Sequence, residues 1–184
     1  MAFYIPRPVS GDIVELILDD HRFMETMLRE LRDSSADRAA ARACFSAALI
    51  AHGEAEEDVV YPVLRKKTEE VGEHEVHHGH EEHAEGNSAL LELLEAKGTD
   101  TQKFDDAIEK LSAYVYHHIC EEELTILNPA RSLPEKQRAD LGVRWLARRS
   151  ELLDTDCGAE ANVRRIVNEA IKDDLIPEEI PEKP

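Results

Sequence analysis

HGEAEEDVVYP (residues 52–62) and HICEEELTILNP (residues 118–129) share one pattern. Each stretch begins with histidine, has glutamate four and five positions later, and closes with proline after an apolar or aromatic residue at the ninth position. Residues four apart on a helix point the same way, about one turn apart along its axis. His52 with Glu56, and His118 with Glu122, can therefore each direct an imidazole and a carboxylate at the same metal centre.

Four amphipathic helices are expected around these stretches, because apolar residues recur at steps of three and four. They cover about residues 12–32, 38–61, 80–96 and 102–127. Pro62 cannot donate the next backbone hydrogen bond, so it is expected to kink or end the second helix. Four such helices with shortish connections predict an all-α fold, an up-and-down antiparallel four-helix bundle.

The chain changes character after Pro129. Two further helices are expected there, with a frayed tail, IPEEIPEKP, at residues 176–184. We therefore predict two parts: a metal-binding bundle at residues 1–130 and a helical C-terminal extension at residues 131–184. No chemistry is assigned to the extension.

Composition narrows the classes of partner. The net charge is -18 and charged residues make up 34% of the 184 residues, which argues against nucleic acid or an anionic membrane surface as partner. No signal peptide is expected, because MAFYIPRPVS has no basic segment leading into an apolar run, and no apolar run is long enough to cross a bilayer. Its three widely spaced cysteines match no ligand or disulfide pattern, so a reduced, cytoplasmic protein is expected.

The two His–Glu pairs lie on the faces expected to point inward. His118 and Glu122 continue the apolar stripe of their helix, as His52 and Glu56 do in theirs, and His21 lies in the stripe of the first helix. A buried carboxylate is costly unless it is paired or bound to metal. Buried ion-pair networks are the alternative, but the inward stripes contain no Lys or Arg, which favours a metal site. Two carboxylates from opposite helices suit two bridged cations of iron, manganese or zinc.

HEVHHGHEEH, residues 74–83, raises the question of which histidines join this centre. Helical steps back from Leu94 and Leu90 lead to His83, with His80 as the next inward position. The remaining three precede Gly79, where the helix is not expected to have begun. Solvated side chains or adventitious metal contacts are favoured for them over a designed second site; they are His74, His77 and His78.

LDDHRF, HGEAEEDVVYP, EEHAEGN and HHICEEELTILNP occur in this order, and with them residues 12–130 resemble the hemerythrin family, specifically bacterial hemerythrin-like proteins with the His-His-Glu cation-binding domain. The resemblance implies a bundle that holds two non-haem iron ions, with zinc or manganese as alternatives. Glu56 and Glu122 would bridge the ions, and Glu57 and Glu123 would hydrogen-bond ligand imidazoles. The implied metal ligands are His21, His52, Glu56, His83, His118 and Glu122.

One departure from the family pattern concerns the third helix. Oxygen-carrying members have a second histidine four residues before the first, and Gly79 stands at that position here. His80 or a water molecule is expected to fill the place. His117 is expected to face away from the centre. Tyr114 is expected to face inward, either as part of the pocket wall or as a plain core residue.

The leading interpretation is a di-iron protein that binds or processes dioxygen, nitric oxide or peroxide, with peroxide decomposition or oxygen reduction as candidate activities. Two other classes remain open at this point. One is a metal-storage or metal-binding protein without redox chemistry. The other is an interaction module in which metal only stabilises the bundle and the C-terminal helices bind a partner.

Overall fold

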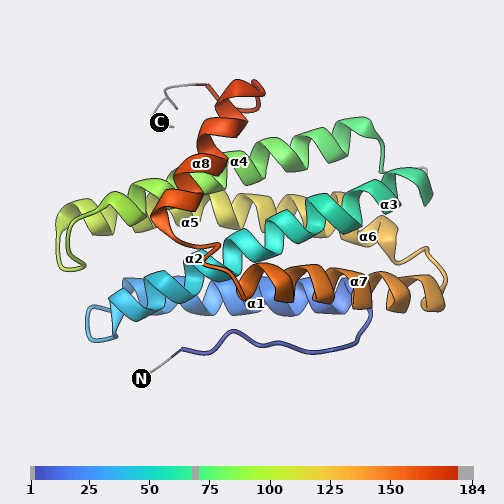
Figure 1. Cartoon of the computed structure of the whole chain (residues 1–184), viewed down its shortest axis with the longest axis horizontal. Helices are drawn as coiled ribbons and strands as arrows, with labels where there is room; N and C mark the ends of the chain where they lie inside the picture. Colours follow the sequence, from blue (N-terminus) through green and yellow to red (C-terminus); the bar gives the residue numbers. More distant parts are fainter. Residues whose placement is uncertain (1–2, 68–70, 178–184) are drawn as a thin grey trace.

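A computed structural model describes residues 3–67 and 71–177, and every regular element among them is helical. The expected all-α bundle is confirmed: four long helices run antiparallel, up and down (Figure 1). Among the described helices, none combines the length and the apolar character that crossing a membrane requires. The four bundle helices are α1 (Ile13–Arg32), α2 (Arg38–Ala55), α4 (Glu73–Glu95) and α5 (Gln102–Glu122).

Side-chain caps set where three of these helices begin. Asp12 accepts a hydrogen bond from the Val14 amide at the start of α1. At the start of α2, Asp37 accepts a hydrogen bond from the Ala40 amide. At the start of α5, the Thr101 hydroxyl accepts one from the Phe104 amide. A cap of this kind satisfies one of the backbone N–H groups that the first helical turn leaves without a partner.

The helix that contains Glu56 does not end at Pro62. A π-helical turn, η1 (Glu56–Val60), follows α2 and leads into α3 (Tyr61–Lys67). Of the two outcomes expected at the proline, a kink or a stop, the stop is therefore wrong. The Tyr61 amide donates to the Glu56 carbonyl, five residues back, and this wider turn makes room for a residue that has no N–H. A second π-helical turn, η2 (Glu123–Leu127), joins α5 to α6 (Asn128–Ala130), which contains Pro129.

The third bundle helix begins earlier than expected. α4 starts at Glu73, where the Gly72 amide donates to the Glu75 carboxylate at 2.9 Å, so the expected start after Gly79 is wrong. Gly79 is buried inside the helix, and a Cβ there would lie 3.0 Å from the Tyr61 hydroxyl oxygen. A helix tolerates such a glycine, at a cost of about 1 kcal/mol, where a neighbour needs this close approach.

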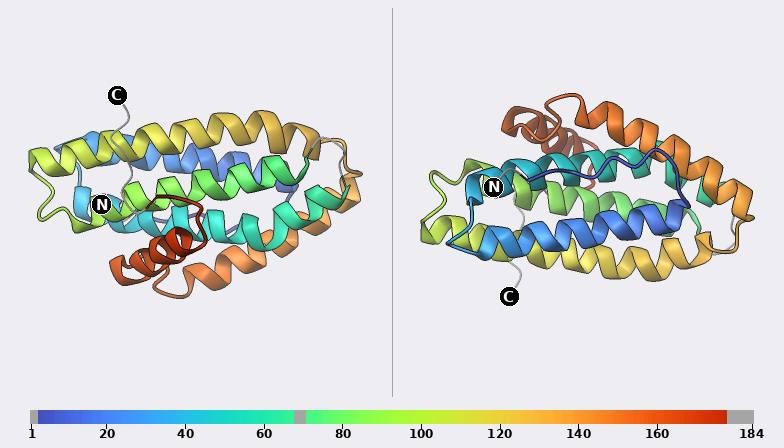
Figure 2. Two further views of the ribbon diagram at one scale, coloured as in Figure 1. Left: turned by 90° about the horizontal axis from the view of Figure 1, so that it is seen from above. Right: turned by 90° about the horizontal axis from the view of Figure 1, so that it is seen from below.

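Both expected helices of the extension are present, as α7 (Glu135–Leu153) and α8 (Glu160–Lys172). α7 lies on the outside of the bundle along α1 and α2, and α8 crosses against α4 (Figures 1 and 2). Trp145 and Leu146 are buried in one core cluster with residues of α1 and α3. The division of the chain at residue 130 stays a prediction, and most of the expected tail, residues 178–184, lies outside the described residues.

A glycine in α7 offers a test of this packing. A Cβ on Gly142 would overlap the backbone carbonyl of Gly11, in the segment that precedes α1. Gly142→Ala should therefore lower the free energy of unfolding by about 1–3 kcal/mol. Gly86→Ala is the matched control, because a Cβ at this helical glycine meets nothing within 4 Å, and it should gain about 0.5–1 kcal/mol. Urea unfolding of both variants is the measurement, and wild-type stability of Gly142→Ala would contradict the close packing of α7.

Candidate metal centre

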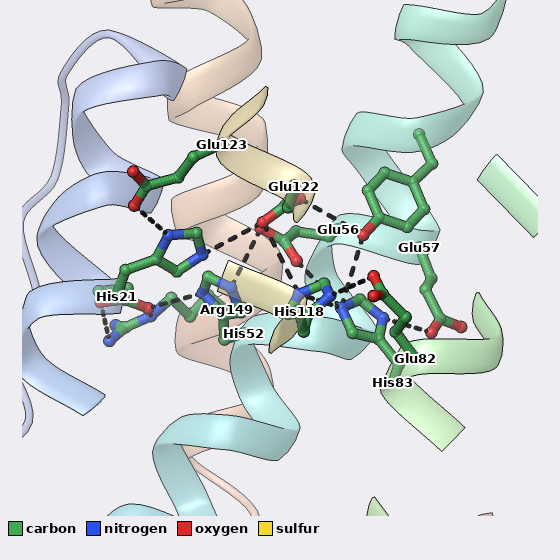
Figure 3. A network of polar contacts seen from close by, with 12 residues as sticks. His21, His52, Glu56, Glu57, Glu82, His83, His118, Glu122, Glu123 and Arg149 are labelled. Carbon is green, nitrogen blue, oxygen red and sulfur yellow. Dashed lines mark hydrogen bonds and ion pairs between the residues drawn. The ribbon is translucent and has the colours of Figure 1, made fainter. Parts of the chain in front are cut away.

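Six side chains from the four bundle helices meet in the interior (Figure 3). They are the six that sequence reasoning singled out, and each is buried, with His83 the most exposed at 8%. α1, α2 and α4 each direct one imidazole inward, α5 directs an imidazole and a carboxylate, and the sixth side chain, a carboxylate, comes from the π-helical turn η1 that follows α2. In chain order the six are His21, His52, Glu56, His83, His118 and Glu122.

One end of this cluster has the spacing of ligands around a single cation. His21 Nε2 lies 3.1 Å from Glu122 Oε2, and His52 Nε2 lies 3.2 Å from Glu56 Oε1. Atoms that bind one ion at about 2.1 Å are themselves about 3.0–3.4 Å apart. These four residues therefore fit one cation.

The other end forms a second group around the same carboxylate. His83 Nε2 lies 3.4 Å from Glu56 Oε2 and 3.1 Å from His118 Nε2. Glu122 Oε2 is 3.8 Å from His118 Nε2. Glu56 thus offers one oxygen to each group, which is the arrangement of a carboxylate between two ions.

The polar atoms at the middle of the cluster lack hydrogen-bond partners among the described residues. They lie within ion-pair distance of one another, but not in directions that suit hydrogen bonds. An unpaired carboxylate this deeply buried costs several kcal/mol, whereas bound cations would use all of these atoms. The residues therefore fit a pair of metal ions; the unpartnered atoms are His21 Nε2, His52 Nε2, Glu56 Oε1, Glu56 Oε2 and Glu122 Oε2.

Each of the four imidazoles is held from behind by a second carboxylate. A hydrogen bond between Nδ1 and a carboxylate fixes the ring so that Nε2 points into the centre. The expectation for Glu57 and Glu123 is confirmed, whereas Asp20 and Glu82 were missed. The pairs are His21 with Glu123 at 3.1 Å, His52 with Asp20 at 3.3 Å, His83 with Glu57 at 2.7 Å and His118 with Glu82 at 3.1 Å.

Arg149, on α7, supports one of these carboxylates. Its guanidinium donates two hydrogen bonds to Asp20, at 2.6 and 2.8 Å, and a third to the Pro6 carbonyl. Arg149 is only 1% exposed, so the C-terminal extension reaches the surroundings of the centre. Sequence reasoning missed this residue, because no local pattern links positions 129 residues apart.

Burial and the neighbouring carboxylates set the charges of the centre. Burial alone would lower the pKa of His21, but the adjacent carboxylates of Glu122 and Glu123 raise it to about 9. Burial would raise the pKa of Glu122, yet His21 beside it and the other nearby imidazoles hold it at about 2. Burial lowers the pKa of His118, and so does the charge of His83, whose own pKa the glutamates raise against burial. Without metal, protonated imidazoles such as that of His21 supply the positive charge that bound cations would otherwise supply.

Tyr61 fills the space beside Gly79. Its hydroxyl donates to Glu122 Oε1 at 3.3 Å and lies 3.5 Å from His83 Nε2. Burial and three nearby glutamates raise its pKa well above the usual value, so the hydroxyl stays protonated and donates. His80 instead pairs with Glu57 at 3.0 Å and belongs to neither group, and the Tyr61 ring occupies the space beside Gly79.

A cavity of about 20 Å³ adjoins the imidazoles of His83 and His118, and Gly86 and Tyr114 complete part of its wall. A volume above about 10–15 Å³ holds one water-sized molecule. Tyr114 faces inward as expected, and it belongs both to this wall and to the buried core. The centre therefore has room beside it for a ligand of two or three atoms at most.

Comparison with known proteins agrees with this geometry. The sequence model described as the hemerythrin HHE cation-binding domain matches residues 12–129, which is well over half of the chain. A protein named DNA nickase, from Nostoc sp. strain PCC 7120, is 28% identical over 145 residues, which cover 77% of this chain and 40% of that protein. No solved structure matches. The family match and the buried histidine–glutamate cluster together lead to one conclusion: the chain belongs to the hemerythrin HHE cation-binding domain family.

Proposed function

We propose that the chain is a non-haem di-iron protein that binds or processes dioxygen, nitric oxide or peroxide. The observation that carries this proposal is Glu56, whose two buried oxygens face two different groups of histidines. Imidazole and carboxylate ligands without thiolate suit iron, and also manganese or zinc, so metal analysis of natively expressed protein is the first test. The proposed ligands are His21, His52, Glu56, His83, His118 and Glu122.

Two iron ions would supply electrons for a small oxygen-type ligand, and the chain would supply the surroundings. The cavity beside His83 and His118 limits the ligand to a few atoms. The Tyr61 hydroxyl can donate a hydrogen bond at this end of the centre, where the third helix has no second inward histidine. The carboxylates behind the imidazoles keep the ligand set in one geometry.

Other functions receive less support. Trp145 and Leu146 of α7 and Val167 of α8 are buried, so these apolar side chains are not offered to a partner. The name of the Nostoc relative gives DNA cleavage as a candidate, but the net charge of -18 and the buried position of the centre favour a small ligand. We propose a cytoplasmic location on the sequence evidence alone.

Removing a bridging carboxylate should lower the metal content. Glu122→Gln and Glu56→Gln should each hold well below two ions per chain, because unbridged cations repel one another. Glu121→Gln is the matched control, since the half-buried Glu121 lies beside Glu122 on α5 but belongs to neither group of proposed ligands, and the substitution should leave the content unchanged. Elemental analysis after iron loading is the measurement. Two ions retained in both bridge variants would rule out the bridging assignment.

The ferric protein should respond to azide. A small cavity adjoins His83 and His118, whose helix α4 offers no second imidazole to the group, so azide should bind there and shift the near-ultraviolet and visible absorption. Tyr61→Phe should weaken azide about 2–10-fold, the worth of one hydrogen bond. Tyr116→Phe, away from the centre, is the control. A spectrum that azide leaves unmoved would show a closed, purely structural centre.

Arg149 should matter for metal binding although it is not a proposed ligand. Arg149→Met leaves the Asp20 carboxylate buried without its cation, at a cost of about 3–5 kcal/mol in unfolding free energy. It also loosens His52, so chelator competition should show iron held about 10–100-fold more weakly. Arg148→Met is the neighbouring control: Arg148 makes an ion pair with Asp58 on the surface, worth about 0–1 kcal/mol.

A double variant separates stability from orientation of the imidazole. Asp20→Asn with Arg149→Met removes the buried charge and should regain part of the lost stability, yet it should still hold iron more weakly than the wild type. Wild-type iron affinity in both the single and the double variant would show that Arg149 contributes to the fold alone.

A further inference from the structure

A third group of metal-type ligands lies outside the buried centre. His78 and Glu82 are one turn apart on α4, and His117 comes from α5. Glu82 Oε1 is 3.7 Å from His78 Nε2 and 3.4 Å from His117 Nε2. The sequence alone favoured a solvated side chain or an adventitious contact for His78 over a second site, because the helix was not expected to begin before Gly79.

Glu82 distinguishes this group from an ordinary surface cluster. Its side chain is only 6% exposed, and its Oε2 accepts a hydrogen bond from His118 Nδ1 at 3.1 Å. Its Oε1 is buried, has no hydrogen-bond partner among the described residues, and faces the two outer imidazoles. A buried carboxylate oxygen without a partner is costly, so a cation between it and the imidazoles would remove an energetic penalty.

The spacing and exposure suit a four-coordinate ion. Two ligand atoms in a tetrahedral site, each about 2.0–2.2 Å from zinc, are roughly 3.3–3.5 Å apart, close to the distances found around Glu82 Oε1. The His78 and His117 side chains are 45% and 51% exposed, so an ion can arrive from solvent and keep a water molecule as its fourth ligand. Two histidines and a glutamate with one open position form a ligand set that zinc commonly uses.

We propose that His78, Glu82 and His117 form an outer binding site for a divalent cation of the zinc class, separate from the buried centre. Glu82 belongs to both places, with Oε1 on the outer cation and Oε2 on the ring of His118. The outer cation would therefore fix the carboxylate that orients a ligand of the inner centre.

Zinc titration of the iron-loaded protein tests this proposal. With the inner centre filled, isothermal calorimetry should record one added Zn²⁺ per chain. His78→Ala and His117→Ala should each weaken this zinc at least about tenfold, because each removes one of three protein ligands. His77→Ala is the matched control, since His77 is equally exposed on α4 but belongs to no such group, and it should bind zinc like the wild type.

Equal zinc affinity in the wild type, His78→Ala and His117→Ala would overturn the outer site. These substitutions replace half-exposed side chains, so the folded protein remains available for the measurement. Iron content and absorption, recorded before zinc is added, report on the inner centre separately. If that centre takes up no iron, the same three titrations still decide the outer site, because the loss of one zinc equivalent in two variants but not in the control does not depend on iron.

Discussion

Two carboxylates, Glu56 and Glu122, lie fully buried where the four bundle helices meet, and the surrounding structure is arranged to compensate their charge. Around them stands a layer of four imidazoles, and behind each imidazole stands another carboxylate. Behind one of those comes the guanidinium of Arg149. Successive layers can carry opposite charges. Each layer therefore compensates the charge of the next, which matters because the protein interior solvates ions poorly.

The π-helical turn η1 explains how one segment serves this centre twice. In a regular α-helix, a residue five positions after Glu56 would be rotated well away from it. In η1, the Tyr61 amide bonds to the Glu56 carbonyl, and Tyr61 comes to lie over Glu56 on the same face. Its hydroxyl therefore reaches Glu122 across the bundle. The π-helical turn thus places a hydrogen-bond donor, the Tyr61 hydroxyl, beside Gly79, which has no side chain of its own.

The features of this molecule that could be predicted are those set by residues close together in the sequence. His52 with Glu56 and His118 with Glu122 follow from helical periodicity alone, and the apolar stripes around them fix which faces point inward. The contribution of Arg149 could not be predicted, because it depends on how α7 packs against α1. The pairing of Tyr61 with Gly79 was hidden for a related reason: a tyrosine and a glycine in different helices become complementary only when their backbones are in place.

The errors in element boundaries also have physical causes. The stretch at the start of α4 is rich in histidine and glutamate, so it lacks the apolar period that marks a helix, and glycine at position 79 suggested a break. Its helix is stabilised by contacts that no single-segment pattern contains. Pro62 was misjudged because a proline stops an α-helix but is tolerated after a wider turn.

The ion pair between Asp20 and Arg149 has a consequence for biosynthesis. Asp20 belongs to the first helix made and Arg149 to the seventh element of α-helix, 129 residues later in the chain. At about 5–20 residues per second, a ribosome needs roughly 6–26 s to add these residues. The last bundle helix, α5, ends at Glu122, so the complete bundle lacks Arg149 only while the final 27 of these residues are added. Until then its interior holds a carboxylate without the guanidinium that neutralises it, and His52 lacks the support of that ion pair. A prematurely terminated product that contains all six proposed ligands would therefore still hold metal less well than the full chain.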